Sequence, residues 1–119
     1  GDWSATSGYQ SLQSLAEREV QFTAVFAQND RMAVGAIRAL REMRLYVPDD
    51  VSVIGFDDMP LASYFDPPLT TVRHDVFCTG CEAMRLLIQA FEHPGSPPQQ
   101  VLLPAELVIR HSTKFSKEN

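Results

Sequence analysis

The sequence predicts an α/β protein with a largely parallel sheet, because short apolar runs alternate with longer stretches of helical periodicity. The clearest run, residues 51–56, is rich in β-branched residues and ends abruptly in Asp57 and Asp58. A strand that is buried on both faces has this pattern, whereas a half-exposed strand alternates polar and apolar residues. We therefore expect a strand buried on both faces here, with its carboxyl end at Asp57.

The other elements follow in alternation. Residues 4–18 and 30–44 space their apolar side chains three and four apart, as amphipathic helices do, and Ser4 can cap the first of them. Trp3 precedes that helix, so residues 1–3 are expected to end a strand whose beginning is missing. Further strands are predicted at residues 22–27, 69–72, 101–103 and 106–110, and a longer helix at residues 76–92.

Length and composition indicate one soluble unit. The chain has 119 residues, 45 % of them hydrophobic and 21 % charged, and it contains no apolar segment long enough to span a membrane. The absence of an initiator Met suggests a cut piece of a larger protein. The net charge is −5 and the two lysines both lie near the C-terminus, which argues against nucleic-acid binding by this segment. Two cysteines are too few for a disulfide scaffold, which favours a reducing cytoplasm.

Three candidate binding residues lie at the carboxyl ends of successive predicted strands: Trp3, Asn29 and Asp57. In open α/β sheets ligands bind along that edge. An indole can cover the apolar face of a sugar, while an amide and a carboxylate pair with its hydroxyl groups. The alternative is that Asn29 and Asp57 only cap helices or shape turns and that Trp3 belongs to the core.

Other chemistry has weaker support. Cys78 and Cys81 have dithiol spacing at a helix start, but a thioredoxin-like context is lacking, and helix packing is the alternative. The three histidines show no paired spacing for zinc. Asp57 and Asp58 resemble the acidic pocket of a receiver domain, which also needs a buried lysine that this chain does not offer. We therefore expect no enzymatic activity, metal or cofactor.

Four separated motifs resemble one family. They are GDWSA with SGY at residues 1–9, TAVFAQNDRMA at residues 23–33, VPDDVSVIGFDD at residues 47–58 and PPLTTV at residues 67–72. In order and spacing they are similar to the C-terminal part of the effector-binding domain of lactose/galactose-repressor (LacI/GalR) transcription regulators. The resemblance extends to about Thr113 and implies a periplasmic-binding-protein-like (type I) fold, present here as an incomplete fragment over residues 1–119.

The resemblance also implies a function. Relatives bind a small effector, usually a sugar or a purine, between two subdomains, and an N-terminal head that this chain lacks binds operator DNA as a homodimer. In sugar-responsive members the positions of Trp3, Asn29 and Asp57 contact the inducer, and a tryptophan at the first position favours a carbohydrate. The expected dimer interface includes the apolar residues Val34, Leu61, Tyr64 and Phe65. The nearest alternative is a periplasmic sugar-binding protein that serves a transporter.

The resemblance yields three structural expectations. The family commonly has glycine where this chain has Arg44, so Arg44 should adopt a positive φ at a helix end. The helix at residues 76–92 belongs to the other subdomain in relatives, so its apolar stripe should be exposed, swapped onto another chain or rearranged. Residues 112–119 should form a flexible tail.

Overall fold

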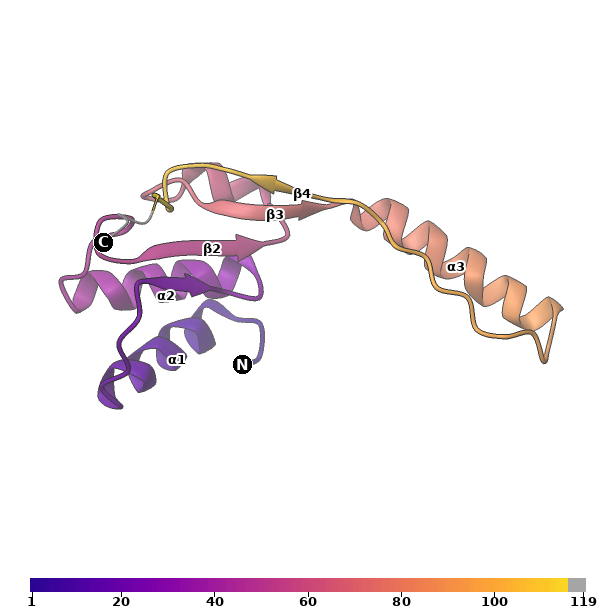
Figure 1. Ribbon diagram of the computed structural model, residues 1–119, viewed down its shortest axis with the longest axis horizontal. Coiled ribbons are helices and arrows are strands. Elements are labelled where there is room, and N and C mark those ends of the chain that lie inside the picture. Colours follow the sequence, from indigo (N-terminus) through magenta and orange to yellow (C-terminus); the bar gives the residue numbers. More distant parts are fainter. Residues whose placement is uncertain (116–119) are drawn as a thin grey trace. The chain divides into compact units, whose positions relative to one another are not determined.

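The computed structural model describes residues 1–115, which form an α/β fold (Figure 1). The elements are α1 (Ala5–Glu17), β1 (Ala24–Phe26), α2 (Asp30–Glu42), β2 (Ser52–Phe56), the 3₁₀ helix η1 (Pro60–Tyr64), β3 (Thr70–His74), α3 (Val76–Glu92) and β4 (Ala105–Val108). The alternation of strands and helices is thus confirmed. Residues 1–3 and 101–103 are not strands, so these two predictions were wrong.

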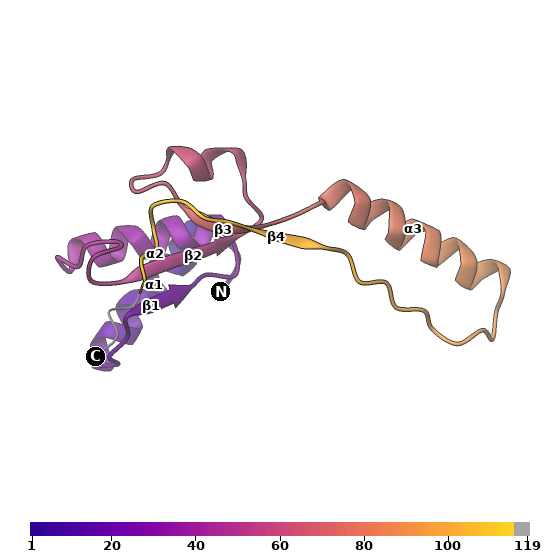
Figure 2. The same cartoon turned by 45° about the horizontal axis from the view of Figure 1, so that its top comes forward.

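The four strands form one sheet in the order β1-β2-β3-β4. Strand β2 pairs in parallel with both β1 and β3, so the predicted parallel character is confirmed for the first three strands. Strand β4 runs beside β3 (Figure 2). The carboxyl ends of β1 and β2 therefore share one edge of the sheet, which is where the candidate residues were expected.

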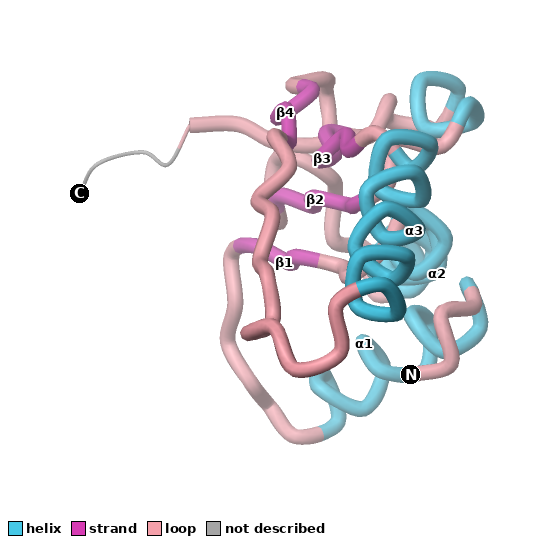
Figure 3. The backbone as a smooth tube through the Cα atoms, turned by 90° about the vertical axis from the view of Figure 1, so that its right-hand side faces the viewer, coloured by secondary structure: helices cyan, strands magenta, loops and turns pink. Residues whose placement is uncertain are grey.

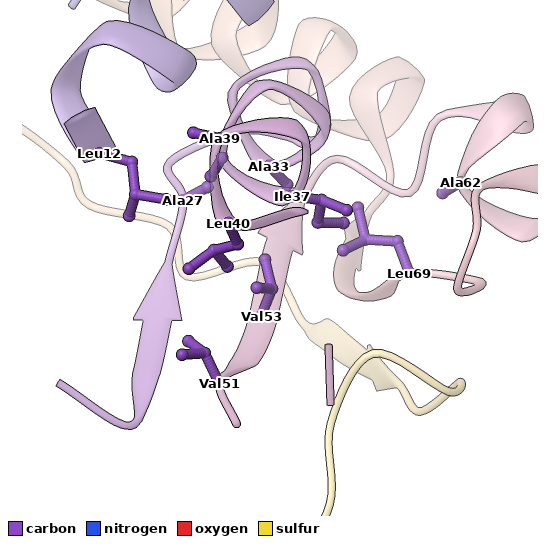
Figure 4. Close-up of a cluster of buried hydrophobic side chains, with 11 residues drawn as sticks. Leu12, Ala27, Ala33, Ile37, Ala39, Leu40, Val51, Val53, Ala62 and Leu69 are labelled. Atoms are coloured by element: carbon purple, nitrogen blue, oxygen red, sulfur yellow. The ribbon is translucent and has the colours of Figure 1, made fainter. Parts of the chain in front are cut away.

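The hydrophobic core lies between α2 and the sheet (Figure 4). Helix α2 packs on β2, and α1 packs on α2. The two helices approach closely because Gly35 has no side chain: a Cβ at this position would lie 1.9 Å from the carbonyl oxygen of Ala5. Leu40, Val53 and Leu69 are fully buried in this core.

Strand β2 is buried on one face and only half-buried on the other, so the prediction that it is buried on both faces was wrong. Its burial alternates: Val53 is fully buried, while its neighbour Ile54 is half-buried. The cause is the position of α1 and α2, which lie on one side of the sheet (Figure 3). Phe26 pairs with Ile54 on the opposite face and is 62 % exposed.

The segment after β4 returns to the sheet and is not a loose tail up to Lys114. Ser112 is fully buried; its hydroxyl donates to the carbonyl of Val53 (2.6 Å) and accepts from the backbone N–H of Thr70 (2.8 Å). The backbone N–H of Val53 in turn donates to the carbonyl of Ser112 (2.7 Å). The expected flexible tail is therefore wrong for this part, and residues 116–119 lie outside the described range.

Residues His74–Glu106 form a second compact unit, separate from Gly1–Arg73 and the segment from Leu107 onward. Helix α3 has the predicted bounds, and its N-cap Asp75 accepts from the backbone N–H of Cys78 (2.8 Å). None of its residues is buried, and Phe77 is 82 % exposed. Of the three alternatives expected for its apolar stripe, the structure of this single chain shows exposure. None of the helices formed by residues 1–115 is long and apolar enough to cross a membrane.

Helix α2 ends as predicted. Met43 is its C-cap, and Arg44 follows with φ 61°. The backbone N–H of Leu45 donates to the carbonyl of Leu40, and that of Arg44 to the carbonyl of Arg41. These bonds use carbonyl groups that the helix end leaves without a partner, and the left-handed residue makes them possible.

Candidate functional site

Asn29 links the start of α2 to the N-terminal segment. Its side-chain oxygen accepts from the backbone N–H of Met32 (2.8 Å), which makes it the N-cap of α2, and its Nδ2 donates to the carbonyl oxygen of Trp3 (3.0 Å). Asn29 is buried. The capping role considered from the sequence is therefore confirmed for Asn29, and the same amide holds the backbone of Trp3 in place.

Trp3 is not a core residue, because its side chain is 60 % exposed. Its backbone has φ 68°, and it lies between Asp2 and the N-cap Ser4. The carboxylate of Asp2 accepts from the hydroxyl (2.6 Å) and the backbone N–H (3.0 Å) of Ser4. These bonds, with a further one from Ser7, lower the pKa of Asp2 to about 2. The chain on both sides of Trp3 is thus fixed while its indole faces solvent.

Asp57 follows β2 directly and has an exposed side chain. Its backbone adopts φ 102°, and its N–H donates to the carbonyl of Val72 on β3 (2.9 Å). The 3₁₀ helix η1 begins after Met59 without a side-chain cap, so Asp57 does not cap it. Because β1 and β2 are parallel, Asp57 and Asn29 lie at the same edge of the sheet, and Asn29 brings Trp3 to it.

The neighbouring Asp58 has a different environment. Its side chain is buried and accepts from Arg110 and from Arg73, each at 2.7 Å. Burial alone raises the pKa of Asp58, but the hydrogen bonds and charges of Arg110 and Arg73 outweigh it, and the net shift is downward. Asp58 therefore anchors the turn in which Asp57 is exposed. Sequence reasoning missed this role, since Arg110 is far from Asp58 along the chain.

Asp30 is the second residue whose role sequence reasoning missed, since its type and position had suggested only a helix cap or a ligand contact. Its carboxylate is buried; Oδ1 accepts from the hydroxyl of Thr71 (2.6 Å) and Oδ2 from the backbone N–H of Met59 (2.8 Å). Burial raises its pKa, and the charges of Asp57 and Asp58 add to this, although the two hydrogen bonds act in the opposite direction. The available signal was a charged residue at the start of an otherwise apolar helix face.

The predicted interface residues lie on α2 and around η1. Leu61 and Tyr64 are exposed, whereas Val34 and Phe65 are half-buried. Val34 lines two hollows beside α2, of about 480 and 300 Å³, and Phe65 lines the smaller. The four residues thus all lie in the compact unit that contains Gly1–Arg73.

The cysteines and histidines do not form a site in the described part of the chain. Cys78 and Cys81 are free thiols on α3. Within residues 1–115, no three His, Cys, Asp or Glu side chains are grouped so that they could hold a metal ion. The groups at the sheet edge are an exposed indole, a buried amide and an exposed carboxylate; indoles interact with ligands by stacking, and amides and carboxylates by hydrogen bonding.

Comparison with known proteins agrees with this architecture. The family model of the periplasmic binding protein-like domain matches residues 1–113. The transcriptional regulator MalR of Streptomyces coelicolor is 50 % identical over 91 residues, which is 76 % of this chain and 26 % of MalR. The chain therefore spans about a quarter of that relative.

Two solved structures are similar over nearly the whole chain. The Lac repressor dimer bound to operator and the anti-inducer ONPF has a TM-score of 0.82 at 40 % identity, covering 95 % of this chain and 39 % of that one. A complex of the transcriptional regulator CelR with cellobiose also has a TM-score of 0.82, at 35 % identity, covering 94 % and 34 %.

The chain belongs to the periplasmic binding protein-like domain family. Within this fold it is part of a LacI/GalR-family effector-binding domain, as the motifs indicated. These relatives are transcriptional regulators.

Proposed function

We propose that this chain is the C-terminal part of the effector-binding and dimerisation domain of a longer cytoplasmic repressor, and that Trp3, Asn29 and Asp57 contact a carbohydrate effector. The observation that carries the proposal is the shared sheet edge, where Asn29 is bonded to Trp3 and Asp57 follows the adjacent parallel strand. Operator DNA would be bound by another part of the protein, since this segment carries a net charge of −5.

Each group would have a separate task. The exposed indole of Trp3 would cover the apolar C–H face of a sugar ring, and the carboxylate of Asp57 would accept hydrogen bonds from its hydroxyl groups. Asn29 already uses both ends of its amide within the chain, so it would act through its remaining hydrogen-bonding capacity. Effector binding would change the operator affinity through different affinities for two arrangements of the repressor.

The fluorescence of Trp3 tests the effector proposal when the full-length parent is compared with its Trp3→Phe variant, since the difference in emission then belongs to Trp3. The full-length parent should be titrated with cellobiose, lactose, glucose and ribose, and with hypoxanthine for a purine effector. We expect a saccharide to change the emission, and Asp57→Asn to weaken its binding about tenfold or more, since a hydrogen bond to a charged group is lost. The control is Asp66→Asn, whose carboxylate is exposed elsewhere on the chain. Equal affinities of wild type and Asp57→Asn would contradict the assignment.

The same proposal includes a homodimer that uses Val34, Leu61, Tyr64 and Phe65. Two observations support it: Leu61 and Tyr64 are exposed apolar side chains, and Val34 and Phe65 line a hollow along α2. Leu61→Glu should convert a dimer of the parent into a monomer in sedimentation equilibrium. Leu87→Glu on α3 is the matched control, because Leu87 is also half-exposed. A dimer that survives Leu61→Glu but is lost with Leu87→Glu would move the interface to the second unit.

A further inference from the structure

Asp30 is a charged group in the core that no ion pair within residues 1–115 explains. Its side chain is 1 % exposed, and its partners are a hydroxyl and a backbone N–H, both neutral. A buried carboxylate carries a desolvation cost, which the start of α2 reduces because helix N-termini favour negative charge. The two hydrogen bonds must therefore provide something that offsets this cost, and the groups they reach indicate what it is.

Those bonds join three elements. Asp30 is the first residue of α2, directly after Asn29; Oδ1 reaches Thr71 on β3, and Oδ2 reaches Met59, two residues after Asp57. The carboxylate crosses β2 at Gly55, where a Cβ would lie 2.2 Å from Oδ1. The glycine thus leaves the space that the carboxylate occupies above the strand.

We propose that Asp30 is a positioning residue for the effector site, which it builds by tying the turn of Asp57 to the helix start that carries Asn29. The inference rests on the proposed function, since Asn29 and Asp57 are its proposed effector contacts. Asp30 itself is buried and does not reach the ligand. Its hydrogen bonds fix the separation of two side chains that lie on different elements.

Two carboxylates and two arginines make up the charged surroundings of Asp30. Asp57 and Asp58 raise its pKa, and Asp58 is itself paired with Arg73 and Arg110. The hydrogen bond from Thr71 lowers the pKa of Asp30. Removing that bond alone should consequently raise the pKa further, which gives a readout of the tie that does not require a ligand.

The first test is an NMR titration of the ligand-free chain from pH 7 downward, following the backbone amide of Met59. Its proton shift should change with a midpoint above 3.8, the ordinary value for Asp. Thr71→Val should move this midpoint upward. Thr70→Val is the matched control, because Thr70 is equally buried on the same strand but bonds to Thr113 and Arg110 on the other face. No upward movement of the midpoint in Thr71→Val, or equal shifts in both variants, would overturn the tie.

The second test separates position from charge in the full-length parent, with cellobiose as the first probe. Asp30→Asn can still accept from Met59 and can donate to the Thr71 hydroxyl, so it should keep the affinity within about threefold while abolishing the titration. Asp30→Ala removes both bonds and should weaken binding at least about tenfold, and Thr71→Val should fall between them. Unchanged binding in both Asp30→Ala and Thr71→Val would sink the positioning role. If no saccharide binds the wild type, the proposed effector class fails, and the NMR result still decides whether the tie exists.

Discussion

Helices α2 and α3 look alike in sequence, yet they have different environments in the structure. Both carry an apolar stripe with helical spacing, but α2 has seven buried residues and α3 has none. Helix α2 lies between α1 and the sheet, whereas the unit that contains α3 has no hydrophobic residue in the buried core. An amphipathic pattern thus specifies a helix and its apolar face, while burial depends on the elements that pack against that face.

The largest expected effect separates the two helices directly. Leu40→Ala in α2 removes a fully buried side chain and should lower the free energy of unfolding by about 3 kcal/mol. Leu87→Ala in α3 is the matched change at a half-exposed position and should cost less than about 1 kcal/mol. Urea denaturation of both variants measures the contrast. Equal losses would mean that the α3 stripe is covered in solution.

The second prediction concerns the polar contacts of the packed unit. Asp58→Asn leaves Arg110 without its carboxylate partner and should cost about 2 kcal/mol at pH 7. Asp66→Asn is the control: its pair with Arg41 is highly exposed on both sides, and its loss should cost less than about 0.5 kcal/mol. Similar losses in the two variants would show that the Asp58 pairs are screened by solvent.

The ion pairs of Asp58 also predict that the free energy of unfolding depends on pH. The folded-state pKa of Asp58 lies below the ordinary 3.8, so its stabilising contribution is complete above 3.8 and is lost as the pH falls through the lowered value. Asp30 acts in the opposite sense, since its raised pKa favours the folded state at low pH and this contribution is lost as the pH rises. Because the charge of Asp58 also raises the pKa of Asp30, Asp58→Asn is compared with its parent in the Asp30→Asn background. Urea denaturation between pH 7 and 2.5 should then show the stability difference shrinking only below about 3.8. A constant difference would contradict the lowered pKa.

The fourth prediction concerns the segment wrongly expected to be a tail. Ser112→Ala removes a buried donor and acceptor, leaving the N–H of Thr70 without its partner, and should cost about 1–3 kcal/mol in thermal or urea unfolding. Ser63→Ala removes only an exposed bond to the carbonyl of Pro60 and should have almost no effect. A neutral Ser112→Ala would restore the original expectation of a loose C-terminus.

The sequence predicted those features that local patterns determine. The caps Ser4 and Asn29, the bounds of α3 and the left-handed Arg44 depend on residues close together in the chain or on a motif that others share. The wrong predictions depended on distant partners. One-sided burial of β2 depends on which faces the helices cover, and the docking of Ser112 depends on strands 42 and 59 residues away.

The residues of the candidate site show the same contrast between local patterns and distant partners. Trp3, Asn29 and Asp57 could be found because each follows or precedes a recognisable element, and the parallel pairing of β1 and β2 supports their common edge. The residues that hold them could not be found, because Asp30 and Asp58 act through Thr71, Met59 and Arg110, which are remote in sequence. A polar residue in an apolar helix face was the one visible sign.

The smallest expected effect concerns the C-terminal ends of α2 and α3. Arg44 has φ 61° and an exposed side chain, so Arg44→Gly should remove backbone strain and raise the unfolding free energy by about 0.5–1 kcal/mol, after allowance for the greater freedom of glycine in the unfolded chain. His93 caps α3 with φ −126°, where glycine relieves nothing, and His93→Gly should therefore be neutral or destabilising. Urea denaturation resolves the two if each curve is fitted with the same m-value. A loss of stability in Arg44→Gly would mean that the arginine side chain contributes more, through its charge near the carboxyl end of α2, than its strained backbone costs.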